Sequence, residues 1–134
     1  MKKDIEFPKV ENVAIAVVKD VQEGAEPEWN VYLINLQDNP LENVLVASTG
    51  YGSQDGEAIK TSTLRHFIGT VEAKSYAKVE IIKEDLFGLS NEYWVSFYLN
   101  SQIYDRKYVF VAESILESNT TEVPLLKKPG VMIL

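Results

Sequence analysis

Seven aromatic residues lie within the twenty residues Asn91–Phe110, NEYWVSFYLNSQIYDRKYVF. Two runs within this region, Glu92–Leu99 and Ile103–Ala112, are rich in aromatic and β-branched side chains, which favour strands. The polar segment Asn100-Ser101-Gln102 between them predicts a short hairpin connection. We therefore expect two antiparallel strands here.

Similar strand-like runs lie N-terminal to this hairpin. Five further runs favour strands by their alternating or continuous apolar character: Val13–Asp20, Glu28–Asn35, Asn43–Thr49, Ala58–Ile68 and Ser75–Ile82. In the last of these, the alternation places Ala77, Val79 and Ile81 towards a core, and Lys78 and Glu80 towards solvent. The glycine-rich segment Gly50–Glu57, GYGSQDGE, predicts a loop between two of the runs.

These runs predict an all-β domain, because no segment holds a 3.6-residue apolar period. Strands without intervening helices pair antiparallel. We expect an immunoglobulin-like or fibronectin-type sandwich of about seven strands, with Trp29 in its core and a small β-barrel as the alternative. A single domain spans 1–134, with 1–12 and 117–134 as flanking segments; the latter could supply an eighth, edge strand.

Composition excludes several classes of site. The chain has no cysteine and one histidine, which excludes disulfides and multi-histidine metal sites, and we expect no cofactor. A net charge of −7 argues against binding to nucleic acid. Acids and a proline follow Lys2 and Lys3, where a signal peptide needs an apolar core, and no apolar run is long enough to span a membrane. A cytoplasmic location is the expectation.

Several stretches resemble a small bacterial single-domain family of unknown function: WNVYLIN, NVLVASTGYG, KTSTLRH, AKSYAKVE, NEYWVSFY and KKPGVM. The similarity covers most of the chain, and some members of that family carry the label phenylalanyl-tRNA synthetase alpha subunit. The label implies at most an accessory role here, because a synthetase site needs a larger domain and several arginines, and this chain has only Arg65 and Arg106. The resemblance implies no active residues.

The segment Ile59–Thr70, IKTSTLRHFIGT, contains the single histidine and is the candidate for catalysis. On a regular strand, Ser62 and His66 are about 13 Å apart, too far for the hydrogen bond of a nucleophile to its base. We therefore predict a strand with a polar face and no catalytic residue. An enzyme that uses His66 with other partners is the alternative, and a pocket that contains His66 and a carboxylate within hydrogen-bond reach would favour it.

The aromatic hairpin is the candidate for binding. Trp94 and Tyr98 share one face of the first strand, and we expect Tyr104, Arg106 or Tyr108 of the second strand to join them. Aromatic and arginine side chains are enriched in interface hot spots. The sequence thus favours a non-catalytic module that binds a protein partner or a second copy of itself. A small-ligand-binding sandwich is a further alternative.

Overall fold

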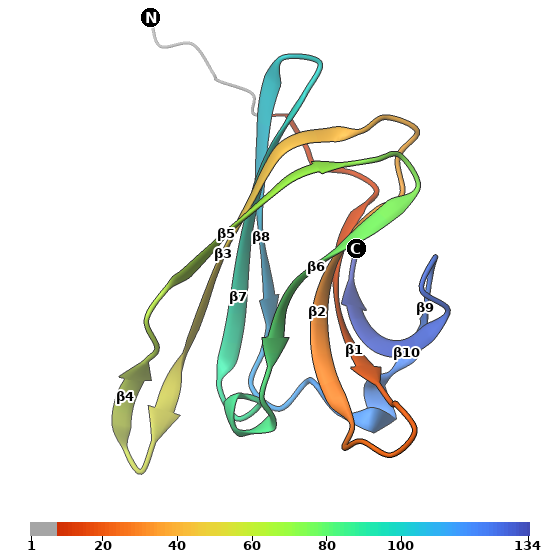
Figure 1. The fold of residues 1–134 in the computed structure, drawn as a ribbon. Helices are drawn as coiled ribbons and strands as arrows, with labels where there is room; N and C mark the ends of the chain where they lie inside the picture. The colour runs from red at the N-terminus through yellow and green to blue at the C-terminus, as the bar shows by residue number, and fades with distance from the viewer. Residues whose placement is uncertain (1–7) are drawn as a thin grey trace, which may run out of the picture.

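The computed structural model describes residues 8–134, which form ten strands and two short 3-10 turns (Figure 1). The elements are β1 (Val13–Asp20), β2 (Glu28–Asn35), β3 (Leu41–Gln54), β4 (Glu57–Lys60), β5 (Leu64–Val71), β6 (Ser75–Ile82), η1 (Glu84–Leu86), β7 (Ser90–Leu99), β8 (Gln102–Phe110), η2 (Glu117–Asn119), β9 (Thr121–Val123) and β10 (Lys128–Ile133). In these described residues, no helix has the length and apolarity to cross a membrane.

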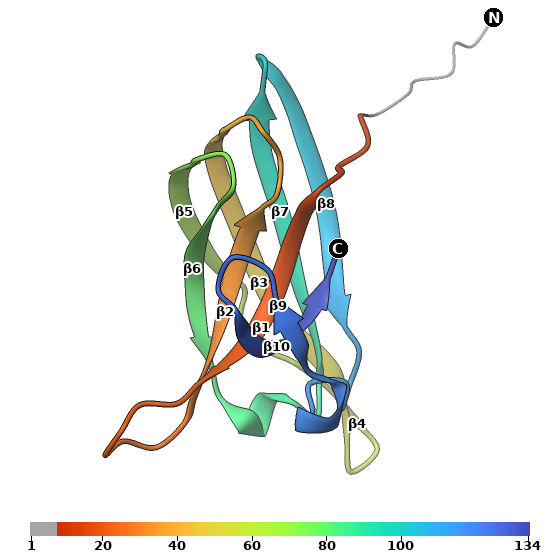
Figure 2. The same cartoon turned by 90° about the vertical axis from the view of Figure 1, so that its right-hand side faces the viewer.

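The strands form two antiparallel sheets that pack face to face, as the two views in Figures 1 and 2 show. The β1 sheet has the order β6-β2-β1-β10-β9. The β3 sheet has the order β4-β3-β7-β8, with β5 paired to another part of the long strand β3. The predicted β-sandwich is confirmed. The barrel alternative is wrong, because neither sheet closes on itself within residues 8–134.

The core lies between the two sheets and is built from alternate side chains of the central strands. Trp29 is buried in it, as predicted, and its ring meets Phe87 edge-on. Tyr108 on β8 is 1% exposed, and its hydroxyl donates to the Val13 carbonyl of β1 at 2.5 Å. Because Val13 belongs to the opposite sheet, this bond joins the two layers directly.

The prediction of a loop at Gly50–Glu57 and one strand at Ala58–Ile68 is wrong. Strand β3 runs on to Gln54 and pairs with β4, and the chain then breaks at 61–63 before β5. The hairpin turns at Asp55-Gly56, whose φ angles of 53° and 80° are both positive. An Asp-Gly pair suits a two-residue turn of this kind, which keeps the flanking strands in register.

The C-terminal segment, expected as a flank, is part of the sandwich. Strand β10 pairs with the central strand β1, and Figure 2 shows β9 and β10 curling across its outer side. Val123 and Leu126 cover a second apolar cluster on that side, around Ala16, Val18 and Ile34. The other flank, 1–12, lies partly outside the described residues; within it, Val10 is buried in the core.

Gly130 allows β10 to approach β1 closely. A Cβ at this position would lie 2.8 Å from the Val17 carbonyl oxygen and 2.8 Å from Val123 Cγ2. We expect Gly130→Ala to lower the free energy of unfolding by about 1–3 kcal/mol, as overpacking does, in urea titrations. Gly88→Ala is the matched control, because a Cβ there meets no atom within 4 Å. Equal stability of the two variants would contradict the close packing.

Candidate functional site

The outer face of the β3 sheet carries the first candidate site. Strands β7 and β8 are joined by a two-residue turn at Asn100-Ser101, so that Trp94 pairs with Lys107 and Tyr98 pairs with Ile103. Directly paired residues of antiparallel strands share a face. Ile103 and Lys107 therefore accompany the two rings on the outer side.

The predicted grouping of five site residues on one face is wrong. Trp94 and Tyr98 are exposed on the outer side, but Tyr104, Arg106 and Tyr108 alternate to the inner side. There Tyr104 stacks on Phe97, and Arg106 lies over the Tyr108 ring. The cause is the turn: the expected three-residue connection would shift the pairing by one residue, and such a shift exchanges the faces of a strand.

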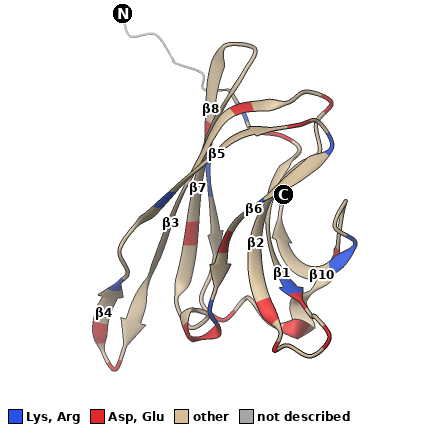
Figure 3. Cartoon of the chain, in the orientation of Figure 1, with Lys and Arg blue, Asp and Glu red and all other residues tan. Residues whose placement is uncertain are grey.

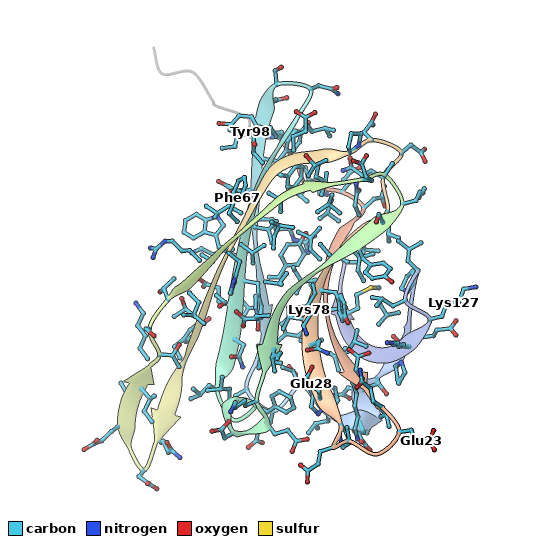
Figure 4. All side chains as sticks on the ribbon, in the orientation of Figure 1. Glu23, Glu28, Phe67, Lys78, Tyr98 and Lys127 are labelled. Atoms are coloured by element: carbon cyan, nitrogen blue, oxygen red, sulfur yellow. The ribbon has the colours of Figure 1, made fainter. Side chains whose placement is uncertain are left out.

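Exposed apolar side chains from four strands share this outer side. We call them the aromatic face: Leu45 on β3, Phe67 on β5, Trp94 and Tyr98 on β7, and Ile103 on β8. Phe67 is 71% exposed and Trp94 45% exposed, and Figure 4 labels Phe67 and Tyr98. Sequence reasoning missed Leu45 and Phe67, because their neighbourhood depends on the pairing of β3 with β5 and β7.

Charges of both signs border the aromatic face. Lys107 Nζ lies 4.7 Å from the centroid of the Trp94 ring, a cation–π contact. Arg65 pairs with Ala47 beside Trp94, while Asp105 and Glu42 lie along the same side of the sheet. A hollow of about 440 Å³ adjoins Trp94, with Arg65 and Glu92 in its wall. By contrast, Figure 3 shows acidic residues on the β1–β2 loop and around η1, at one end of the sandwich.

The second candidate site centres on Glu80, which was predicted to face solvent. A β-bulge at Val79 leaves that residue without a partner on β2, so that Glu80 pairs with the buried Val31 and turns inward, while Ile81 turns outward. The expected directions of Glu80 and Ile81 are therefore wrong. Bulges re-aim side chains in this way and recur next to active sites.

Three donors from the facing sheet hold the Glu80 carboxylate. Ser48 Oγ donates to Oε1 at 2.7 Å, and Tyr93 donates its hydroxyl to Oε2 at 3.1 Å. His66 Nε2 lies 2.7 Å from Oε1. Burial of the phenol, the charge of Glu80 and the hydrogen bond from Tyr93 to Glu80 together raise the pKa of Tyr93 well above its usual range. The Tyr93 phenol is protonated at neutral pH and donates its proton to Glu80.

His66 thus has a carboxylate within hydrogen-bond reach, which is one half of the observation that would favour an enzyme; the other half, a pocket that contains His66, is not met by the cleft beside Glu80, whose lining lacks His66. The hydroxyl nearest to this pair belongs to Ser48, and it bonds Glu80 itself rather than His66. A nucleophile needs its proton to be taken by the base, so Ser48 is not arranged as the nucleophile of a triad. Sequence reasoning missed Ser48, Glu80 and Tyr93, since only the bulge brings them together.

A cleft of about 110 Å³ opens beside Glu80, between the two sheets. Its walls include Gly50 of β3, Thr61 and Leu64 near the start of β5, and Asn91 of β7. Gly50 and Thr61 bond each other twice, from Gly50 N to Thr61 Oγ1 and from Thr61 N to Gly50 O, both at 2.8 Å. These bonds hold the Gly50 and Thr61 part of the cleft wall in place.

Comparison of the chain with models of known protein families and with curated proteins finds no match. Function is therefore inferred from the chemistry of these two sites.

Proposed function

We propose that this protein is a non-catalytic interaction module that pairs with a second copy of itself through the aromatic face. The observation that carries the proposal is the exposure of Phe67 and Trp94 on one continuous sheet surface, with Leu45, Tyr98 and Ile103 beside them. Contiguous exposed apolar surface of this kind marks protein–protein contacts. Its residues come from rigid strands, so the surface needs no ordering before it binds.

A second copy of the chain is a suitable partner, because charges of both signs border the aromatic face. In a two-fold contact the same patch serves both subunits, so a residue of one copy meets a different residue of the other. The aromatic face is bordered by Arg65 and Lys107 together with Glu42 and Asp105. Each copy can therefore place its cations against the acids of its partner. The net charge of −7 opposes association elsewhere on the surface, which favours contact at this mixed region.

Truncation of two exposed rings tests the proposal. We expect Phe67→Ser and Trp94→Ala each to weaken self-association by tenfold or more in sedimentation equilibrium, since buried aromatic anchors dominate interfaces. Their thermal midpoints, measured at concentrations where the wild type is monomeric, should change by less than about 3 °C. Phe67 is already 71% exposed in the single chain, so its removal costs the fold little.

Val21→Ser provides the matched control, because Val21 is 70% exposed but lies on the β1–β2 loop, away from the aromatic face. It should leave association unchanged. A wild-type protein that stays monomeric at millimolar concentration overturns the proposal, as does equal weakening by Val21→Ser.

A second candidate function is an enzyme that uses His66, favoured by the 2.7 Å contact between His66 Nε2 and Glu80 Oε1. A carboxylate that fixes the histidine ring is part of many acid–base sites. In such a site a water or substrate in the neighbouring cleft would have to supply the reacting hydroxyl, because Ser48 is bonded to Glu80. We rank it second, since no described hydroxyl bonds the His66 ring.

A further inference from the structure

The cleft beside Glu80 is independent of the aromatic face, because it opens on the other side of the β3 sheet. Ser48 and Tyr93, on its wall, alternate with the outward residues Ala47 and Trp94. An occupant of the cleft therefore leaves the aromatic face uncovered. The question is which chemistry the cleft would accept.

Glu80 has acceptor capacity that the protein does not use. Its side chain is only 13% exposed, so the carboxylate has lost most of its contact with water. Oε1 receives Ser48 and His66, but Oε2 receives Tyr93 alone, and a carboxylate oxygen accepts about two hydrogen bonds. One acceptor position on a largely buried anion is left for a donor within the cleft.

Asn91 adds a second unused acceptor to the same cleft. The residue is 5% exposed, and its Nδ2 donates to the carbonyls of Leu86 and Leu89, which fixes the orientation of the amide. Its Oδ1 then points towards Gly50, where a Cβ would lie 3.3 Å away. Among residues 8–134, no side chain or backbone donor bonds this oxygen. This oxygen is not fully enclosed, since Asn91 lines the cleft, so a ligand or a water in the cleft can donate to it.

These acceptors point to a ligand that carries N–H donors and a positive charge. We propose that the cleft binds the protonated nitrogen of a small organic cation, a primary ammonium group. Glu80 would supply the counter-charge and Asn91 Oδ1 a second acceptor, while Leu64 and Leu86 would contact the carbon chain. A volume of about 110 Å³ is below that of the cavity that holds benzene, so only the head group and a few carbons fit.

The head group could belong to a free amine or to a lysine side chain of another protein. Two probes distinguish these sources: n-butylammonium, and N-acetyl-lysine-N-methylamide, which carries the same head group on a peptide unit. Titration of the full-length, ¹⁵N-labelled protein should give saturable amide shifts at Gly50, Leu64 and Asn91 with n-butylammonium. Tighter binding of the lysine probe would identify a protein side chain as the source; equal or weaker binding would identify a free amine. Neutral 1-butanol, of the same length, should give no saturable shift.

Three variants locate the effect. Glu80→Gln keeps the shape but removes the charge, and it should raise the Kd for n-butylammonium at least tenfold. Glu72→Gln removes the same charge from an exposed position on the β5–β6 turn and should leave the Kd unchanged. Gly50→Ala places a methyl group 3.3 Å from both Asn91 Oδ1 and Thr61 Cγ2. It should abolish binding by filling the cleft, although the Glu80 carboxylate is unchanged.

Three outcomes overturn the inference: no saturable shift with either cation, equal binding of 1-butanol, or equal affinity in Glu80→Gln and the wild type. If the amide spectrum shows that Glu80→Gln is unfolded, unchanged binding by Gly50→Ala overturns the inference instead. None of these results bears on self-association through the aromatic face, which is measured separately.

Discussion

A chain that ends at Thr120 is expected to be unfolded under conditions where the full chain is folded. The deletion removes β9 and β10, and with them the ladder that pairs Ile15, Val17 and their neighbours on β1 with β10. Strand β1 lies between β2 and β10 in the sheet order. It would become an edge strand with apolar side chains on both faces, a form that soluble proteins avoid.

The outer apolar cluster adds to this loss. Val123 is fully buried against Ala14, Ala16, Val18 and Ile34. Exposing an aliphatic side chain of this kind costs roughly 1.5–3 kcal/mol, and several would be exposed together. Burial alone would raise the pKa of Asp20. Hydrogen bonds from Lys128, Asn30 and Tyr32 lower this pKa instead, and the deletion removes Lys128. A folded domain is typically only about 5–15 kcal/mol more stable than its unfolded chain, so several such losses together are expected to unfold it.

Far-UV circular dichroism and amide chemical-shift dispersion test this expectation. The matched control ends at Ile133 and loses only Leu134, which is exposed. The control should unfold cooperatively with a midpoint near that of the full chain. A truncated chain that keeps dispersed amide signals and a cooperative transition would show that the C-terminal strands are an appendage.

The strands themselves were predictable from the sequence. The boundaries Val13–Asp20, Glu28–Asn35 and Ser75–Ile82 agree with β1, β2 and β6. Alternation or continuous burial, with turn residues at both ends, is a local property of the chain. For the same reason, the all-β class and the antiparallel pairing followed from the absence of a helical period.

The face on which each side chain of β6 and β8 lies was not predictable, because it depends on a shift of one residue in the pairing with the neighbouring strand. The bulge at Val79 exists only relative to β2, and nothing in SYAKVEII marks it. The β7–β8 register depends on whether Gln102 is a turn or a strand residue; Asn100 and Ser101, both with positive φ, form the whole turn. Both differences moved functional candidates: Glu80 to the inside, and Ile103 and Lys107 to the aromatic face. The Asp55-Gly56 pair, by contrast, was a readable hairpin signal.

Tyr108→Ala is expected to lower the free energy of unfolding by about 3–5 kcal/mol, the range for removal of a buried aromatic ring. The ring is 1% exposed and lies between the sheets, where its loss leaves a cavity. Tyr108→Phe keeps the ring and removes only the hydroxyl that donates to the Val13 carbonyl, so it should cost about 1 kcal/mol. Urea titrations at neutral pH measure both. Equal losses in the two variants would show that the hydrogen bond, not the packing, joins the layers.

The buried hydroxyl of Tyr108 is also expected to make the free energy of unfolding fall at alkaline pH. Burial raises the pKa of Tyr108 to about 12, against the opposing effect of Arg106, from an ordinary value of 10. The folded state therefore holds this proton more tightly than the unfolded state, so the contribution is fully present below pH 10 and is lost as pH rises through 12. Two pKa units correspond to about 3 kcal/mol. The wild type should lose more stability than Tyr108→Phe between pH 10 and 12, while Tyr76→Phe, which removes an exposed hydroxyl, should follow the wild type. Parallel curves for Tyr108→Phe and the wild type would mean that the buried phenol ionises as readily in the folded protein as in the unfolded chain.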